Sequence, residues 1–387
     1  MAQFSCEGGR FWEEIFSEVT LSSDITYGSA VNVTGANQSL QLDIYEPAGD
    51  TATRRPLLIL AHGGSFVFGN KTGPDVVPIC AKYAKMGYVV ASISYRLGYE
   101  NFFPNPVTAV QTVYRASSDM KAAIRYFRAQ VDAGNNTFRI DPDYIFSGGV
   151  SAGAFTALHA AYLNEASEIP AEINPAEYGG IEGNSGNPGF SSAVRGVVNL
   201  CGAIGDTSWI VAGDPPCVSA HGTADNTVPY GTAVINVLGQ NLLTVDGSAS
   251  IVARLENLGI DNPFASWPGV GHTPFVTDDI YRDSVYQIVT PFLARLVGCE
   301  TPSGIQSAQS PPAVFPNPFE SNGFTVRSSV HWTKGRITDL SGRTVICLEN
   351  PNRSKSFLVV ESLNSGVYLL QLEQEDGRTA WCKVIRR

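Results

Sequence analysis

The serine at position 151 has the surroundings of a nucleophile. It stands in Gly149-Val150-Ser151-Ala152-Gly153, directly after the apolar run 144–146 and directly before the small-residue segment 152–163. The run predicts a strand and the segment predicts a helix, and G-x-S-x-G in that context is typical of a sharp turn that exposes a serine hydroxyl. The glycines fit because the turn leaves no room for side chains, and the serine is expected to have a strained backbone.

A serine hydroxyl needs a base to take its proton and an acid to orient that base. Three histidines follow Ser151 before residue 300, namely His159, His221 and His272. His272 is the expected base, because it lies late in the chain on a glycine-flanked loop after the predicted strand 264–267. His159 lies two turns along the predicted helix, so we expect it to point away from the turn and to be structural. His221, at a strand end, is expected to brace its loop.

The candidate acid is Asp225, which comes just past the predicted strand 217–220. A carboxylate at that strand end can reach a histidine on the next loop, and the order serine, acid, histidine is a known one. Asp206 and Asp214 follow the preceding strand and are the competing candidates. We favour Asp225 over both.

Backbone donors for a developing oxyanion are expected from His62-Gly63-Gly64-Ser65, which follows the predicted strand 57–61. Glycines there let the backbone approach a substrate and aim the N–H groups of Gly63, Gly64 and Ser65 at the negative charge. The N–H of Ala152, next to the nucleophile, is the other expected donor. The alternative interpretation of the motif alone is a tight turn.

Several aromatic residues fall in loops near these motifs. As substrate-binding residues we select Phe66, Phe68 and Trp209, which would line a pocket for an aromatic acyl group; Phe102 and Phe103 are further candidates. Ordinary core packing is the alternative for each of them.

The elements that must position these residues follow an α/β pattern. Apolar runs predict buried strands, and stretches with helical periodicity lie between them. The predicted strands are 57–61, 89–95, 144–147, 194–200 and 217–221, and the predicted helices are 105–131, 152–163 and 279–297. Strands that alternate with helices indicate a mostly parallel sheet flanked by helices. Residues 19–26 and 41–45 predict an antiparallel hairpin at its edge.

Two segments break this pattern. Residues 164–192, rich in glycine and proline, predict a lid or pocket wall, with an idle surface loop as the alternative. Residues 301–312, rich in Ser, Gln and Pro, predict a linker. Short strands separated by turns follow, and they predict a small β-sandwich over 313–387. The expected organisation is therefore a catalytic domain over 1–300, a linker and a sandwich.

The 387 residues carry a formal charge of −10, which argues against nucleic acid or an anionic membrane as a partner. Apolar runs fall short of the roughly 20 residues that span a bilayer. The start, Met1-Ala2-Gln3-Phe4-Ser5, is not an apolar signal segment, and we expect that an export signal has been removed.

Seven cysteines are scattered without a CxxC pair, so the spacing of a metal site is absent and no metal is expected. Cys201 and Cys217 flank one loop and are the expected disulfide. Cys347 and Cys382 are a second candidate pair in the tail. The alternative is that all seven cysteines are buried and reduced.

These motifs together resemble the α/β-hydrolase superfamily, in particular its HGG-bearing carboxylesterases, over residues 20–298. Tyr95-Arg96-Leu97 is similar to a strand-end motif of esterases related to hormone-sensitive lipase, in which aspartate precedes the tyrosine; here Ser94 does. Because the oxyanion motif is also HGGS rather than HGGG, that subfamily is not assigned. The resemblance implies ester hydrolysis through an acyl-enzyme by Ser151, His272 and Asp225, without metal or organic cofactor.

The tail resembles the C-terminal sorting domain of the type IX secretion system of Bacteroidota. The motifs that carry the resemblance are Pro316-Asn317-Pro318-Phe319, Ile337-Thr338-Asp339-Leu340-Ser341-Gly342-Arg343, Gly366-Val367-Tyr368-Leu369-Leu370 and the basic end Lys383-Val384-Ile385-Arg386-Arg387. The resemblance implies the secretion machinery as a partner and export to the cell surface or medium. A carbohydrate-binding sandwich is the alternative.

A secreted esterase of such a lineage suggests feruloyl, acetyl or other short or aromatic acyl esters, free or linked to polysaccharides, as substrates. Polyester or lipid ester hydrolysis and a serine exopeptidase of the same fold are the alternatives. An inactive surface-binding protein is a further one.

Overall fold

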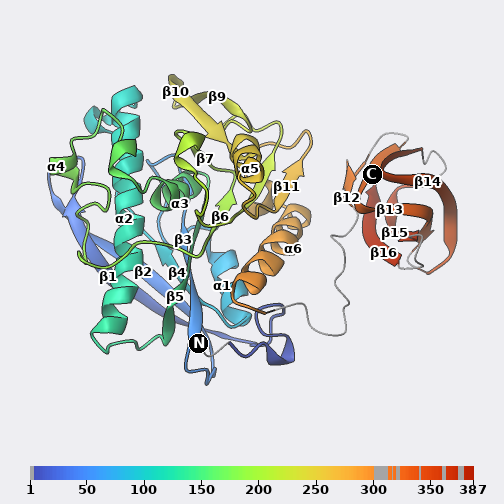
Figure 1. Ribbon diagram of the computed structural model, residues 1–387, viewed down its shortest axis with the longest axis horizontal. Coiled ribbons are helices and arrows are strands. Elements are labelled where there is room, and N and C mark those ends of the chain that lie inside the picture. Colours follow the sequence, from blue (N-terminus) through green and yellow to red (C-terminus); the bar gives the residue numbers. More distant parts are fainter. Residues whose placement is uncertain are drawn as a thin grey trace. The chain divides into compact units, whose positions relative to one another are not determined.

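The computed structural model of the chain describes residues 4–299, 313–315, 317–319, 323–339, 341–359, 363–373 and 379–387. The chain forms two compact units, Met1–Glu300 and Thr301–Arg387, which are considered one at a time (Figure 1). The expected linker 301–312 lies outside the described residues.

The first unit is built on an eight-stranded sheet with the order β1-β2-β4-β3-β5-β6-β8-β11. The strands are β1 (Val19–Val31), β2 (Asn37–Pro47), β3 (Arg55–Ala61), β4 (Val89–Ile93), β5 (Ile140–Val150), β6 (Gly196–Leu200), β8 (Cys217–Gly222) and β11 (Phe264–Trp267). From β4 to β11 neighbouring strands run parallel, whereas β1 and β2 form an antiparallel hairpin at the edge. The edge hairpin and the parallel centre were both expected.

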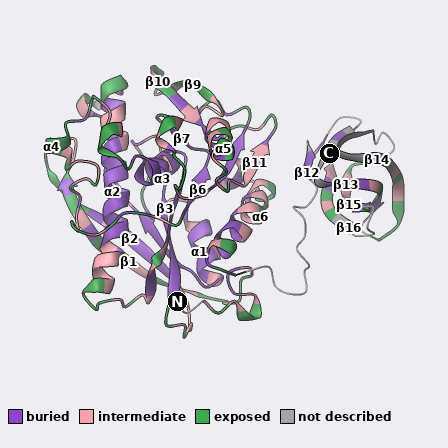
Figure 2. Ribbon diagram, in the orientation of Figure 1, coloured by how far each residue is buried: buried purple, intermediate pink, exposed green. Residues whose placement is uncertain are grey.

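Helices cover both faces of this sheet (Figure 1). One face packs against α2 (Pro106–Asp132), α3 (Ala152–Tyr162) and α5 (Ser248–Asn257), and the other against α1 (Val77–Lys85) and α6 (Asp279–Leu296). Residues of β3 alternate between these faces, with Leu57 and Ile59 in the first core and Leu58 and Leu60 in the second. Because both faces are covered, the central strands β3 and β4 are buried at every position and mostly apolar (Figure 2).

A small second sheet has the strand order β7-β10-β9. It consists of β7 (Ala203–Ile204), β9 (Thr232–Val237) and β10 (Gln240–Gly247). The sequence analysis did not predict these strands, and it did not predict α1 or α5 either. The strand-forming residues Val234, Ile235 and Val237 before Leu238-Gly239, and Leu242, Leu243 and Val245 after it, are the signal that was available for the β9–β10 hairpin.

Residues 164–192 contain the one-turn 3-10 helix Ala166–Glu168 and the short α4 (Pro175–Tyr178). Long side chains of α2 hold this segment by its carbonyl groups. Lys121 Nζ donates to the carbonyls of Leu163 and Ile181 at 2.9 and 2.7 Å, and Arg125 donates to that of Gly186 at 2.8 Å. The residue before the glycine-rich segment and the second half of the segment are therefore tied to α2.

The second unit is an antiparallel sheet of β12 (Ala313–Phe315), β13 (Gly323–Asp339), β14 (Thr344–Val359), β15 (Gly366–Glu373) and β16 (Thr379–Arg386). The expected strands 324–328 and 336–339 are two parts of one strand, β13, whose pairing with β14 is irregular on both sides of Trp332. Trp332 is buried in the core of this unit with Phe324, Ile337 and Leu370.

The two expected disulfides are wrong, because Cys201, Cys217, Cys347 and Cys382 are all free thiols. The N–H of Cys201 bonds to the carbonyl of Ala220, three residues beyond Cys217, which separates the two cysteines by about 10 Å at strand spacing. Cys347 lies on β14 and Cys382 on β16, three strands apart, or about 14 Å. A disulfide bridges α-carbons only about 4.4–6.8 Å apart.

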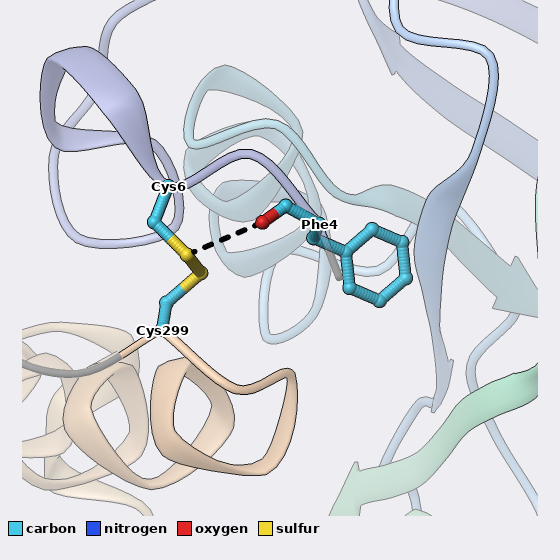
Figure 3. Close-up of a disulfide and its surroundings, with 3 residues drawn as sticks. All are labelled: Phe4, Cys6 and Cys299. Atoms are coloured by element: carbon cyan, nitrogen blue, oxygen red, sulfur yellow. Dashed lines mark hydrogen bonds between the residues drawn. A yellow bond between two sulfur atoms is a disulfide. The ribbon is translucent and has the colours of Figure 1, made fainter. Parts of the chain in front are cut away.

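The disulfide in the structure joins Cys6 to Cys299, with the α-carbons 5.6 Å apart (Figure 3). It connects the N-terminal segment to the residue just past α6, across a sequence separation of 293. Sequence spacing gave no indication of this pair, since only the fold brings the two ends of the first unit together.

None of the described helices is both long and apolar enough to cross a lipid bilayer.

Candidate active site

Ser151 occupies a strained turn between β5 and α3. Its backbone has φ +54° and ψ −118°, a conformation that residues with side chains rarely adopt. The flanking glycines are needed because the turn is packed against backbone. A Cβ on Gly149 would lie 2.3 Å from Gly153, and one on Gly153 would lie 2.0 Å from the carbonyl oxygen of Ala61. The Ser151 side chain is thereby lifted above the ends of the strands.

The structure brings Ser151, His272 and Asp225 together in a hydrogen-bonded chain. His272 Nε2 lies 2.9 Å from Ser151 Oγ, and its Nδ1 lies 2.6 Å from Asp225 Oδ2. The three residues are 47 to 121 positions apart in sequence and come from the turn after β5, the loop after β8 and the loop after β11. Ser151 is 8 % exposed, so the hydroxyl is shielded but reachable.

Asp225 is held as an ionised acceptor. Its Oδ1 accepts the backbone N–H groups of Thr227 and Val228 at 2.8 and 2.9 Å. Its Oδ2 is shared, because His221 Nε2 lies 3.1 Å away in addition to His272. Burial of the carboxyl group favours its neutral form, but the hydrogen bonds from His221 and His272 outweigh this and hold the pKa of Asp225 well below its usual range.

His221 was expected to brace its loop, and it does more, because it contacts Asp225 itself. Its ring is buried, and Nδ1 lies 2.7 Å from Ser248 Oγ at the start of α5. Ser248 Oγ in turn accepts from the side chain of Asn199 at 2.9 Å. The carboxylate of Asp225 is thus connected through His221 to a buried polar network.

The competing acids have other hydrogen-bond partners. Asp206 Oδ1 accepts the N–H of Ser208 at 2.7 Å and caps a short 3-10 helix. Asp214 accepts from the N–H of Val211 at 2.8 Å and from Asn164 at 3.2 Å. Neither carboxylate has a contact with His272 among the described interactions, so geometry favours Asp225.

The loop 62–65 differs from expectation at one residue. The N–H of Gly63 donates to Asp75 Oδ2 at 2.7 Å, so it is already used and is not free to bind an oxyanion. The N–H groups of Gly64, Ser65 and Ala152 have no partner among the described residues. Gly64 has φ +113°, and a Cβ there would lie 2.1 Å from the carbonyl oxygen of Phe68, so this position requires glycine.

The shape of this loop depends on residues that the sequence analysis did not select as site residues. Tyr95 O–H donates to the carbonyl of His62 at 2.7 Å, and Tyr99 O–H donates to that of Ser65 at 3.0 Å. The His62 ring stacks on Tyr95 with ring centres 4.5 Å apart, and burial lowers its pKa. These contacts and that of Asp75 fix where the loop's free N–H groups point.

A cavity of about 310 Å³ opens beside Ser151. Phe66 and Trp209 are among the residues that line it. Phe68 does not, because its side chain is 66 % exposed, and Phe103 is 76 % exposed. The side chain of Phe102 lies outside the described residues. Aromatic type alone therefore did not identify which phenylalanine faces the cavity.

His159 also lines this cavity, contrary to the expectation that it points away from the site. Its Nδ1 lies 2.8 Å from the carbonyl oxygen of Phe155, and Nε2 accepts the N–H of Gly205 at 3.3 Å, which defines a neutral ring. Burial lowers the pKa of His159 to about 4. It is therefore a neutral part of the cavity wall and has no contact that would make it a base for Ser151.

One group of three possible metal ligands occurs among the described residues, namely Cys201, Asp225 and His272, whose ligand atoms lie within 4.8 Å of one another. Two of the three are already hydrogen-bonded to each other. Burial raises the pKa of the Cys201 thiol to about 12, so the thiolate that a metal requires is disfavoured.

Taken together, the arrangement can remove a proton from a serine hydroxyl and hold a nearby negative oxygen. His272 is positioned to accept the Ser151 proton while Asp225 holds the other ring nitrogen. The N–H groups of Gly64, Ser65 and Ala152 are the donors left for an oxyanion.

Two protein families match this chain. Residues 42–204 match the BD-FAE family, and residues 313–386 match the secretion system C-terminal sorting domain. The second match confirms the expected sorting domain and indicates export by a secretion system.

Similar proteins of known name match this chain over part of their length. Gut esterase 1 of Caenorhabditis elegans is 28% identical over 147 residues, which is 37% of this chain and 25% of that protein. The probable carboxylic ester hydrolase LipM of Mycobacterium tuberculosis is 26% identical over 153 residues, 39% of this chain and 31% of that protein. The chain thus spans about a quarter to a third of the length of these relatives.

Solved structures agree on the fold. Esterase 2 of Thermogutta terrifontis, phosphoramylated by tabun, aligns with a TM-score of 0.52 and 20% identity over 73% of this chain and 96% of that one. A truncated carbohydrate esterase from gut microbiota aligns with a TM-score of 0.51 and 24% identity over 74% and 98%. The α/β-hydrolase fold expected for the first unit is confirmed.

Proposed function

We propose that this chain, which joins an α/β-hydrolase domain of the BD-FAE type to a secretion system C-terminal sorting domain, is a secreted carboxylic ester hydrolase. Residues 1–300 are the catalytic domain in this proposal and 313–387 the sorting domain. The observation that carries it is the chain of contacts from Asp225 through His272 to Ser151, at 2.6 and 2.9 Å, beside an apolar cavity. Its substrates are feruloyl, acetyl or other short or aromatic acyl esters, free or attached to polysaccharides.

The reaction has two halves. Ser151 Oγ bonds to the ester carbonyl carbon while its proton passes to His272 Nε2, and the carbonyl oxygen becomes an oxyanion that Gly64, Ser65 and Ala152 stabilise. The carbon–oxygen bond to the alcohol then breaks, and the alcohol leaves with the proton from His272. Water adds to the acyl-enzyme by the same route, releasing the carboxylic acid and restoring Ser151.

Residues 164–192 act as a fixed wall in this proposal rather than as a moving lid. Pro170 lines the cavity, while Lys121 and Arg125 hold the following residues by their carbonyl groups. Because these contacts are largely buried, opening the segment would leave cationic groups without partners.

The test compares the full chain with Ser151→Ala on p-nitrophenyl acetate, butyrate and octanoate, methyl ferulate and a peptide p-nitroanilide. Ser147→Ala is the matched control, because Ser147 lies on the same strand and its buried hydroxyl has no described partner. We expect the wild type and Ser147→Ala to hydrolyse esters. In Ser151→Ala, kcat should fall by at least about 10³-fold.

A fluorophosphonate should add its mass to the wild type and to Ser147→Ala but not to Ser151→Ala. Ester hydrolysis that survives Ser151→Ala would refute the assignment of the nucleophile. Turnover of the anilide without turnover of the esters would replace the proposal with a peptidase.

A further inference from the structure

The β9–β10 hairpin supplies one side of the cavity beside Ser151. It is inserted between the loop that carries Asp225 and helix α5. Its contribution to the lining is mostly alkyl and comes from Ile235, Val237, Leu242, Leu243 and Val245, with Asn236 as the polar exception. A single hairpin therefore provides a large part of an apolar wall in a site whose reacting groups come from other loops.

The hairpin is irregular where it faces the cavity. Asn236 pairs with Asn241, and the next pair is Val234 with Thr244. Ile235 alone on β9 thus stands opposite both Leu242 and Leu243 on β10, which is a β-bulge. A bulge re-aims side chains that a regular strand would send to opposite faces, and this accounts for two consecutive leucines in the lining.

The base of the hairpin is anchored. Asp246 accepts the N–H and the O–H of Thr207, both at 2.9 Å, and the O–H of Thr232 at 2.5 Å. The N–H of Gly247 donates to the carbonyl of Gly231 at 3.0 Å. The turn is open to solvent, with Leu238 59 % exposed, so the bulge lies between a fixed base and an exposed turn.

The cavity lies on the acyl side of the reacting carbon. Its lining includes Ser151 and Ala152, and His272 is not among the residues that line it. The leaving oxygen of an ester must lie next to His272, because that ring gives it a proton. The group on the other side of the carbonyl carbon, the acyl group, is therefore the one directed into the cavity. A volume of about 310 Å³ is at the low end for small-molecule sites and far larger than an acetyl group needs.

We propose that the bulge of Ile235, Leu242 and Leu243 determines acyl specificity, and that it selects esters of bulky apolar acids, aromatic or of medium chain length, over acetate. The proposal rests on the proposed ester hydrolysis and names the substrate class of that same site. The physical reason is that each methylene group buried against alkyl side chains strengthens transition-state binding, so kcat/KM rises about fourfold per methylene until the cavity is filled.

The test uses the full chain and p-nitrophenyl esters from acetate to decanoate. Ile235→Trp should fill the cavity and lower the ratio of kcat/KM for octanoate to that for acetate by at least tenfold, with acetate hydrolysis retained as the sign of a folded active site. Leu243→Ala should shift the optimum to a longer acyl chain. Val234→Ala is the matched control, because Val234 adjoins the bulge, is 52 % exposed and does not line the cavity.

The outcomes separate the two proposals. Absence of ester turnover in the wild type would overturn the proposed function and this inference with it. Ester turnover with ratios unchanged in both bulge variants, or shifted equally by Val234→Ala, would overturn only the inference. A series of alkyl acetates tests which side of the ester enters the cavity. If Ile235→Trp changed the dependence of kcat/KM on alcohol length and not that on acyl length, the alcohol would occupy the cavity and the assignment would be refuted.

Discussion

Replacing Asp225 with asparagine is expected to stop catalysis while leaving the fold intact, and the structure determines how the new amide will lie. Two backbone N–H groups point at Oδ1, so the amide oxygen must take that position. The amide NH₂ then takes the place of Oδ2, facing His272 Nδ1 and His221 Nε2. Both ring nitrogens must become acceptors of the two amide hydrogens.

The consequence for His272 is a change of tautomer. With Nδ1 as an acceptor, its proton moves to Nε2 and points at Ser151 Oγ, so the ring is no longer a base for the serine. In serine hydrolases with this arrangement the same substitution lowers kcat about 10⁴-fold, equivalent to about 5 kcal/mol of transition-state stabilisation. The carbonyl oxygen of Val228, 3.3 Å from His221 Nε2, then loses a donor, so the free energy of unfolding should fall by about 1–2 kcal/mol.

The assay is the steady-state hydrolysis of p-nitrophenyl butyrate, with thermal unfolding measured on the same samples. KM should stay within about threefold, because Asp225 does not line the cavity. Asp206→Asn is the matched control, since Asp206 lines the cavity but only caps a short helix, and its kcat should stay within about threefold. If Asp225→Asn kept more than about a tenth of the wild-type kcat, or Asp206→Asn lost as much, the tautomer argument would be refuted.

Three further predictions concern stability and the support of the site. Reduction of Cys6–Cys299 should lower the free energy of unfolding by about 3–5 kcal/mol, measured by thermal unfolding with and without reductant, because the bridge closes a loop with a sequence separation of 293. Burial lowers the pKa of Lys121 from 10.5 to about 8, so between these values the unfolded chain keeps a proton that the folded chain has released. The free energy of unfolding should therefore rise with pH across that window, by up to about 3 kcal/mol relative to Lys121→Met, in denaturant titrations from pH 7.5 to 10.5. Finally, His221→Asn should lower kcat about tenfold with KM unchanged in the butyrate assay, since one hydrogen bond to the charged Asp225 carboxylate is lost.

Each of these has a contrary result. If the thermal midpoint of unfolding were the same with and without reductant, the Cys6–Cys299 disulfide would contribute nothing to stability. If the free energy of unfolding depended on pH in the same way for the wild type and Lys121→Met, the ammonium group of Lys121 would not be buried as described. If His221→Asn and Ser248→Ala lowered kcat equally, and also lowered the thermal midpoint of unfolding equally, the buried network around His221 would have a purely structural role.

The sequence was informative about the fold wherever the pattern is local. Largely apolar strands such as β3 and β4 are recognisable because both faces of the sheet are covered, and their bounds differ from expectation by only a few residues. The β9–β10 hairpin was missed because the bulge breaks the alternation of apolar and polar residues, and most of its positions are partly or fully exposed. The two parts of β13 were taken as separate strands because an irregular pairing interrupts the alternation around Trp332.

The sequence by itself determined the sharp turn at Ser151, the glycine loop after β3, and the sorting domain, because each depends on residue types within a few positions of one another. Tertiary structure decided the rest, because it depends on residues far apart in the chain. It placed Asp75 on the N–H of Gly63 and removed that donor, joined Cys6 to Cys299, and turned Phe66 but not Phe68 toward the cavity. Local spacing carries no information on such contacts, since they form only when the folded chain brings separate segments together.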